Sequence, residues 1–204
     1  MKVITLTGIG HEANTYLLVS GRSAAVVDPA VSIERISAAL EKENAALKAI
    51  LLTHAHADHT LTLAAVRKAY GAPLMLGKDE AAFLCDANLN LSPYITGRAE
   101  TFADAERLLD DGDTVYIGEE ALTVLHLPGH TRGSIAFLWN NALVCGDTVF
   151  AQGFGRYDLP TGNPLTLKES LKRLSELDGE IMLFPGHGTS CRIKNAQALI
   201  QIKK

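Results

Sequence analysis

Residues 53–59 read Thr53-His54-Ala55-His56-Ala57-Asp58-His59 and come directly after an apolar run at residues 49–52. A short apolar run that ends in a polar cluster is typical of a buried strand that leads into a site. Histidines two residues apart project the same way from an extended segment, and Asp58 and His59 follow where the chain turns into a helix. Imidazole and carboxylate groups together suit zinc, manganese or iron. The stretch therefore predicts a metal site at the end of a buried strand.

Three further ligand-type residues each follow an apolar run and lie next to glycine. They are His130 in Pro128-Gly129-His130-Thr131, Asp147 in Cys145-Gly146-Asp147-Thr148, and His187 in Pro185-Gly186-His187-Gly188. Glycine beside a ligand lets the backbone turn sharply and lets a metal or substrate approach closely. We therefore expect these three residues to join the first cluster from the ends of other strands, and the two remaining histidines, His11 and His126, to lie outside it.

The spacing of apolar residues divides the chain into two similar halves of strands and helices. Strands are expected at residues 2–7, 15–20, 24–27, 49–52 and 74–76, and again at 114–117, 122–127, 134–138, 142–144 and 181–184. Helices are expected at 61–70, 78–85 and 192–202, through the helically spaced Ile33, Ile36, Leu40 and Leu47, and after a capping box of Thr166 and Glu169. Residues 86–109 give mixed signals. Two such halves pack most simply as sheets with helices outside.

Length and composition limit the kind of protein this is. The 204 residues suit a single domain over 1–204, and the formal net charge of −4 argues against a nucleic-acid surface. No apolar run approaches the ~20 residues of a membrane helix, and the N-terminus lacks the apolar core of a signal peptide. Three widely spaced cysteines without a CxxC pair indicate neither a disulfide framework nor a thiolate zinc site. These features predict a soluble, cytoplasmic protein without nucleic-acid or membrane partners, and they leave its oligomeric state open.

The motif His54-x-His56-x-Asp58-His59, followed in order by Gly-His130-Thr, Gly-Asp147 and Gly-His187-Gly, resembles the metallo-β-lactamase fold superfamily of binuclear hydrolases. The resemblance runs from the N-terminal strands to Gly188. It implies an α/β fold of the four-layer αββα sandwich type, with a site in a cleft along one sheet edge. Asp28-Pro29 also resembles the Asp-Pro after the family's third strand, which implies a hydrogen bond from one of the metal-binding histidines.

The resemblance also implies a role for each ligand-type residue. One divalent ion would be held by His54, His56 and His130, a second by Asp58, His59 and His187, and Asp147 would bridge the two. Zinc is the default metal, and such carboxylate-containing sites also accept iron or manganese. A hydroxide between the ions would attack an acyl carbonyl, because bound cations lower the pKa of water from 15.7 toward about 7. Asp58 and Asp147 are accordingly the residues expected to be catalytic.

Within the superfamily, the sequence resembles the glyoxalase II-like branch. True β-lactamases of this fold place Cys at the position of Asp147 or lack the bridging carboxylate. Residues 153–163, which include Gly153-Phe154-Gly155-Arg156-Tyr157-Asp158, resemble the Gly-Arg segment of enzymes that hydrolyse S-2-hydroxyacyl glutathione. The resemblance implies a thioester substrate of this type. Arg156 is expected either to pair with a substrate carboxylate, since guanidinium suits bidentate contacts, or to be an ordinary surface arginine.

The chain differs from glyoxalase II proper in two places. The sequence runs for seventeen residues after His187, so we expect it to lack the C-terminal helical domain that supplies much of the glutathione site in glyoxalase II. It also has Leu61-Thr62 where family members often have Gly-Gly, a change that metal binding should survive. The closest match is therefore a small single-domain hydrolase whose acyl group and thiol carrier stay open.

Two alternative activities fit the same motifs. A persulfide dioxygenase looks similar, shares the Gly-Arg-x-Asp segment, and would hold one iron through His56, His130 and Asp147. A hydrolase of another ester or a lactone would use the same metal pair. The complete set of residues for a second metal favours a hydrolase.

Overall fold

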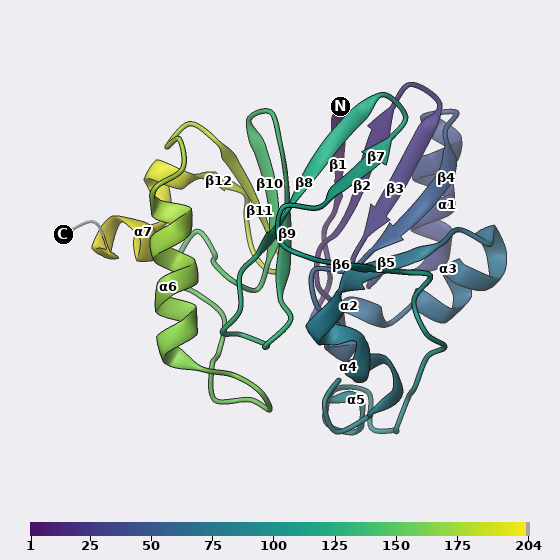
Figure 1. The fold of residues 1–204 in the computed structure, drawn as a ribbon. Helices are drawn as coiled ribbons and strands as arrows, with labels where there is room; N and C mark the ends of the chain where they lie inside the picture. The colour runs from purple at the N-terminus through teal and green to yellow at the C-terminus, as the bar shows by residue number, and fades with distance from the viewer. Residues whose placement is uncertain (203–204) are drawn as a thin grey trace.

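The apolar runs of the first half form a six-stranded sheet in the computed structural model, which describes residues 1–202. Across the sheet, the strands are β1 (Lys2–Leu6), β2 (Thr15–Ser20), β3 (Ser23–Val27), β4 (Ala46–Leu51), β5 (Leu74–Gly77) and β6 (Arg107–Leu109). The first three strands pair antiparallel, and β3 to β6 pair parallel. Helices α1 (Ile33–Lys42) and α3 (Leu63–Tyr70) cover the outer face of this sheet (Figure 1).

The second half forms another six-stranded sheet, which packs against the first. In chain order its strands are β7 (Thr114–Ile117), β8 (Glu120–His126), β9 (Ile135–Trp139), β10 (Ala142–Gly146), β11 (Met182–Pro185) and β12 (Cys191–Arg192). Only β10 and β11 pair parallel in this sheet, over the residues described. Helices α6 (Pro164–Ser175) and α7 (Gln197–Ile202) lie on its outer side (Figure 1). The four-layer αββα order is the predicted one.

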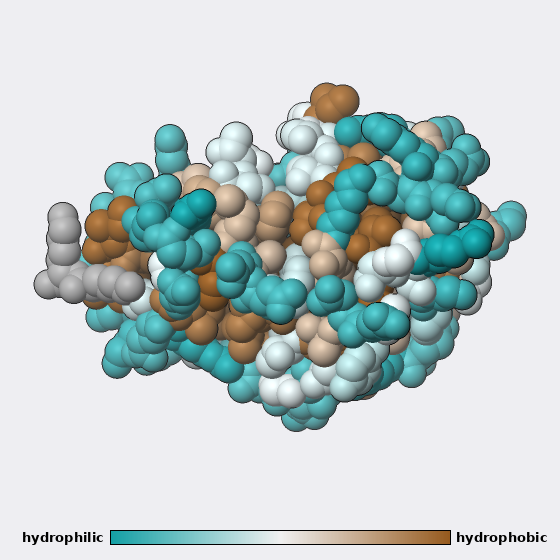
Figure 2. Space-filling view, turned by 90° about the horizontal axis from the view of Figure 1, so that it is seen from above, coloured by the Kyte–Doolittle hydropathy of each residue, from teal (hydrophilic) through white to brown (hydrophobic). Residues whose placement is uncertain are grey.

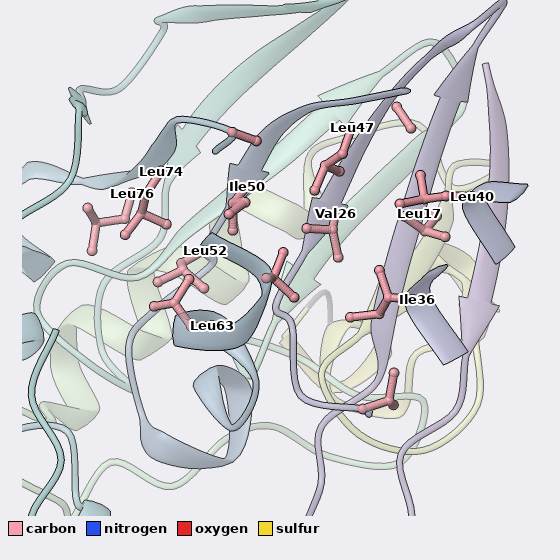
Figure 3. Close-up of a cluster of buried hydrophobic side chains, with 14 of the residues drawn as sticks. Leu17, Val26, Ile36, Leu40, Leu47, Ile50, Leu52, Leu63, Leu74 and Leu76 are labelled. Carbon is pink, nitrogen blue, oxygen red and sulfur yellow. The ribbon is translucent and has the colours of Figure 1, made fainter. Parts of the chain in front are cut away.

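Three apolar layers hold these four layers of structure together. In β2, Leu17 points to the helical side and Leu18 to the second sheet, as the two-residue period of a strand requires. Figure 3 shows the layer beneath α1 and α3, where Ile36 and Leu63 face the strands. The other two layers fill the space between the sheets and the space under α6 and α7. Each fully buried Leu or Ile contributes about 1.5–3 kcal/mol, so both halves are fixed firmly against each other.

Short helices gather at the lower end of the molecule in Figure 1. They are α2 (Ala57–Thr60), α4 (Ala81–Cys85), which follows the 3-10 turn η1 (Lys78–Glu80), and α5 (Ser92–Ile95). Hydrophilic residues cover most of the opposite face, with hydrophobic patches between them (Figure 2). Among residues 1–202, none of the helices has both the length and the apolar character needed to cross a bilayer.

Two expected helix boundaries are wrong. Helix α1 ends at Lys42, because Asn44 takes a left-handed conformation with a φ of 49°, and Leu47 lies in β4 instead of on the helix. The closing helix begins only at Gln197, because residues 191–195 first pair with β11 and then form the 3-10 turn η2 (Ile193–Asn195). The spacing of apolar residues alone does not locate the boundary between a helix and a strand that lie a few residues apart.

The predicted capping box is also wrong. Asn163, three residues earlier than Thr166, is the N-cap of α6, and its Oδ1 accepts hydrogen bonds from the N–H groups of Leu165 (2.9 Å) and Thr166 (3.2 Å). Pro164 takes the first helical position, where its missing N–H costs nothing. The hydroxyl of Thr166 donates to the Asn163 carbonyl and caps no N–H group.

Replacing the cap should therefore weaken α6. We expect Asn163→Ala to lower the free energy of unfolding by about 1 kcal/mol, because two N–H groups lose their acceptor. Thr166→Ala, at an exposed position in the same turn, serves as the control and should cost less than half as much. Urea denaturation of both variants measures the difference. An equal loss in the two variants would show that the box, and not Asn163, caps the helix.

Candidate metal centre

The His54–His59 stretch leaves the end of β4 and is held there by Asp28, which follows the neighbouring parallel strand β3. The Asp28 carboxylate is fully buried and accepts hydrogen bonds from the N–H (2.8 Å) and the hydroxyl (2.6 Å) of Thr53. It also accepts one from Nδ1 of His59 at 2.9 Å. This last bond turns Nε2 of His59 toward Asp147, whose Oδ1 lies 3.3 Å away. The hydrogen bond to Asp28 expected from the resemblance is confirmed.

Three imidazole nitrogens converge at the first group of ligand-type residues. Nε2 of His130 lies 3.0 Å from Nδ1 of His56 and 3.2 Å from Nε2 of His54. Nδ1 of His130 donates to the carbonyl oxygen of Arg156 at 2.7 Å, so Nε2 carries a lone pair. The lone pair on Nε2 of His130 thus points toward nitrogens of His54 and His56. A cation among the three nitrogens stabilises this arrangement.

A second group lies beside the first, and Asp147 lies between the two. Oδ2 of Asp58 is 3.2 Å from Nε2 of His187. Oδ2 of Asp147 is 3.7 Å from Nε2 of His130 in the first group and 3.7 Å from Nε2 of His187 in the second. The structure therefore brings together all seven predicted residues, which share three overlapping clusters: His54, His56 and His130; His54, His59 and Asp147; Asp58, His59 and His187.

Burial and neighbouring charges set the protonation of these groups. Burial, together with the adjacent His130, lowers the pKa of His56 to about 3, so His56 is neutral at pH 7. Burial also lowers the pKa of His54 well below its usual value. Although burial opposes it, His59 holds the pKa of Asp147 well below the usual range. The neighbouring carboxylates of Asp147 and Asp28 raise the pKa of His59 well above its usual value, although burial opposes this. The neutral imidazoles of His54 and His56 and the ionised carboxylate of Asp147 are the forms that bind divalent metals.

The packing leaves polar atoms that the protein itself does not satisfy. Among the described residues, Nε2 of His56 is buried without a hydrogen-bond partner, and Nε2 of His59 and Oδ1 of Asp147, which lie 3.3 Å apart, face only each other. Each such atom costs about 1–3 kcal/mol unless something else pairs with it. Nitrogen and oxygen donors without sulfur suit zinc, iron or manganese. The residues present thus fit divalent metal ions.

Two glycines make this close approach of strands possible. A Cβ on Gly186 would lie 2.1 Å from Oδ1 of Asp147, and a Cβ on Gly146 would lie 2.3 Å from Oγ1 of Thr53. Neither position has room for a side chain. Glycine at these two positions therefore lets the backbone lie against Asp147 and Thr53.

The loop that carries His187 follows β11 of the second sheet, but hydrogen bonds from residues of the first half of the chain hold it in place. The amide of Asn14 donates to the carbonyls of Pro185 (3.2 Å) and Gly188 (3.0 Å), and the Tyr16 hydroxyl donates to Pro185 at 2.6 Å. These bonds join the two sheets at the level of the ligand-type residues.

The other singled-out residues lie around this cluster. His126 donates from Nε2 to the Arg132 carbonyl at 3.0 Å, and His11 is exposed, so both lie outside the cluster as expected.

Arg156 lines the cavity of about 320 Å³ that contains the cluster. Its guanidinium donates hydrogen bonds from Nε and Nη2 to the two carboxylate oxygens of Asp158, at 2.9 and 3.0 Å.

Glu80 is a residue of this site that the sequence did not indicate. Its side chain is fully buried at the end of η1. Oε1 accepts from the N–H of Ala55 at 3.0 Å, and Oε2 accepts from the hydroxyl of Thr131 at 2.8 Å. Ala55 lies between His54 and His56, and Thr131 follows His130. One carboxylate therefore ties together the two loops that supply the first group.

Glu80 should also make stability depend on pH. Burial raises its pKa to about 7, above the ordinary value of 4.5, so its contribution to stability is full below pH 4.5 and is lost as the pH rises through 7. Glu80→Gln removes this dependence. The difference in unfolding free energy between wild type and variant should therefore shift by on the order of 2 kcal/mol between pH 4.5 and 8, in favour of the wild type at low pH.

Urea denaturation at several pH values measures that difference. Asp104→Asn, at an exposed residue of the loop before β6, is the control and should give a difference that does not vary with pH over this range. A pH-independent difference for Glu80→Gln would contradict the prediction.

Comparisons with known proteins agree with this geometry. The family described as the Metallo-beta-lactamase superfamily matches residues 8–187. A probable metallo-hydrolase of Bacillus subtilis, YqgX, is 33% identical over 189 residues, which cover 91% of this chain and 90% of that protein.

Solved structures with more than 30% identity have the same fold. The BLEG-1 B3 metallo-beta-lactamase superposes with a TM-score of 0.88 at 32% identity, covering 95% of both chains. TTHA1623 in a di-iron-bound form superposes with a TM-score of 0.82 at 31% identity, covering 94% of this chain and 96% of the other.

Proposed function

The chain belongs to the metallo-beta-lactamase superfamily, and we propose that it is a binuclear, metal-dependent hydrolase of the glyoxalase II-like branch that cleaves a thioester. The observation that carries the proposal is the position of Asp147 between two groups of ligand-type residues, with its Oδ2 3.7 Å from a histidine of each. A carboxylate in that position suits a bridge between two cations. The di-iron form of the TTHA1623 relative supports a two-metal site of this kind.

In this proposal the two groups keep the roles implied by the motif. The first metal would be held by His54, His56 and His130 and the second by Asp58, His59 and His187, with Asp147 available to both. Zinc is the default ion, and iron or manganese suits the same donors. When bound, the ions polarise the substrate carbonyl and make hydroxide available near neutral pH.

The protein's own groups prepare the site for this chemistry. Asp28 and the Arg156 carbonyl fix which nitrogens of His59 and His130 face the cluster. Burial alone would raise the pKa of Asp58, but the hydrogen bond from His187 and the charge of His59 hold it below the usual value. Asp58 and Asp147 are therefore ionised and accept hydrogen bonds from the attacking water. The reaction adds that water across the acyl C–S bond and gives a carboxylate, a thiol and, at neutral pH, one proton.

Arg156 is proposed to meet a carboxylate of the thiol carrier at the rim of the cavity. Its guanidinium is exposed and already forms a bidentate pair with Asp158. A substrate carboxylate must therefore take the place of Asp158, and an exposed pair of this kind is weak enough to exchange.

A second candidate activity is β-lactam hydrolysis, because the BLEG-1 relative is described as a B3 metallo-beta-lactamase and is 32% identical. The reaction is also a hydrolysis at an acyl carbon, so the same site suits it. Hydrolysis of other esters or lactones, and oxygen-dependent persulfide oxidation through His56, His130 and Asp147 alone, are the remaining alternatives.

Side-by-side assays on one metal-loaded preparation separate these activities. We expect hydrolysis of S-lactoylglutathione, no oxygen uptake with glutathione persulfide, and thioester turnover well above β-lactam turnover. Elemental analysis should find close to two metals per chain. Oxygen uptake by protein that holds a single iron, without thioester cleavage, would overturn the hydrolase assignment. Faster turnover of β-lactams than of thioesters would favour the second candidate.

Removing the bridge should affect both metals. We expect Asp147→Ala to bind each metal more than about 100-fold more weakly and to lose hydrolysis, because one carboxylate serves both ions. Asp104→Asn, at an exposed position away from the cavity, is the control and should keep both metals. Calorimetric titration with zinc measures the two affinities. Two unchanged zinc sites in Asp147→Ala would contradict the bridging role.

A further inference from the structure

Apart from the ligand-type residues, the cavity over the cluster is lined mainly by apolar side chains. Its volume is about 320 Å³. The apolar lining comes from two segments far apart in the chain, α5 with the residue before it and the loop after β10: Leu91, Ile95, Phe150, Phe154 and Leu159. Phe154 is 44% exposed and stacks on Tyr157 with ring centroids 6.3 Å apart. An exposed aromatic side chain beside a polar cluster is typical of a surface that a ligand covers.

Leu91 is held at the cavity against its local preference. Its φ of +62° is in the left-handed region, which costs a leucine about 1–2 kcal/mol, yet the side chain is buried. The neighbouring Asn90 fixes the backbone of Leu91, because the Asn90 carbonyl accepts a hydrogen bond from the N–H of Ala57 at 2.7 Å. Its side-chain amide donates to the carbonyls of Phe83 (3.1 Å) and Glu100 (2.9 Å). The α5 wall is thus tied rigidly to the segment that carries Asp58 and His59.

Cationic groups are scarce in this cavity. Arg156 is the one Lys or Arg among its lining residues within the described part of the chain, and Asp158 already engages it. A charged or strongly hydrated acyl group would lose water against Leu91, Ile95 and Phe154 without gaining a partner there. An apolar acyl group has no hydrogen bonds to water to give up when it lies against these side chains.

From this lining, which rests on the thioester hydrolase proposed above, we infer that the natural substrate carries an apolar acyl chain that lies against Leu91, Ile95 and Phe154. Its carbonyl then reaches the ligand cluster, and the thiol carrier extends past Arg156 to solvent. Each methylene that leaves water on binding improves affinity about fourfold. The wall therefore selects a hydrocarbon acyl group over a small hydroxyacyl group.

The test compares two thioesters that share the carrier and differ only in the acyl group. For the metal-loaded wild type, kcat/KM for S-hexanoylglutathione should exceed that for S-lactoylglutathione by at least about tenfold. Phe154→Ala and Ile95→Asn should reduce this ratio by at least about threefold. Tyr116→Ala removes another exposed aromatic residue, in β7 and outside the cavity lining, and should leave the ratio unchanged. Thermal denaturation checks that each variant is folded.

A binding measurement separates failure of this inference from failure of the proposed function. Calorimetry on the metal-loaded protein should show hexanoate binding more tightly than lactate, and Phe154→Ala should weaken hexanoate binding. Equal binding, or a ratio of kcat/KM at or below one, overturns the apolar acyl site and leaves the hydrolase standing. Preferential hexanoate binding without hydrolysis of either thioester supports the apolar site and overturns the thioester hydrolase.

Discussion

Five imidazoles and two carboxylates, most of them buried, crowd together at the junction of two sheets, and they do not satisfy all of one another's polar atoms. Nε2 of His130 faces two other ring nitrogens within 3.2 Å, and Nε2 of His56 has no hydrogen-bond partner among the described residues. A polypeptide keeps such an arrangement only if strong packing elsewhere imposes it or if cations neutralise it. Here the packing imposes the positions, and the donor set suits divalent metal.

The packing comes from layers that cross the boundary between the halves of the chain. Apolar residues of β2 and β3 face the second sheet, and Asn14 and Tyr16 of the first half hold the loop that carries His187. Glu80 ties the loop of His56 to that of His130. Since each ligand-type residue follows the end of a strand, the two sheets place all seven within one small volume. The apolar wall of the cavity depends on the same loops, because the N–H of Ala57 donates a hydrogen bond to the carbonyl of Asn90, just before α5.

The gathering of the ligand-type residues was predictable from the sequence because their signals are local, whereas the αββα order came from the resemblance of the whole motif to a known family. His54 and His56 follow an apolar run at once, and a glycine precedes each of His130, Asp147 and His187. Glu80 was not predictable: its partners lie 25 and 51 residues away, and Lys78-Asp79-Glu80 looks like any surface turn. Leu91 was missed because tertiary hydrogen bonds override its backbone preference. Leu47 shows the reverse error, since its helical spacing from Leu40 is coincidental and it lies in a strand.

The central claim is that the two halves of the chain build one site for two metals joined by Asp147. Anomalous diffraction from crystals of the zinc-loaded protein tests it most directly. The account predicts two peaks per chain, one among His54, His56 and His130, the other among Asp58, His59 and His187, with the Asp147 carboxylate in contact with both. A single peak, or a second peak away from Asp147, would contradict it.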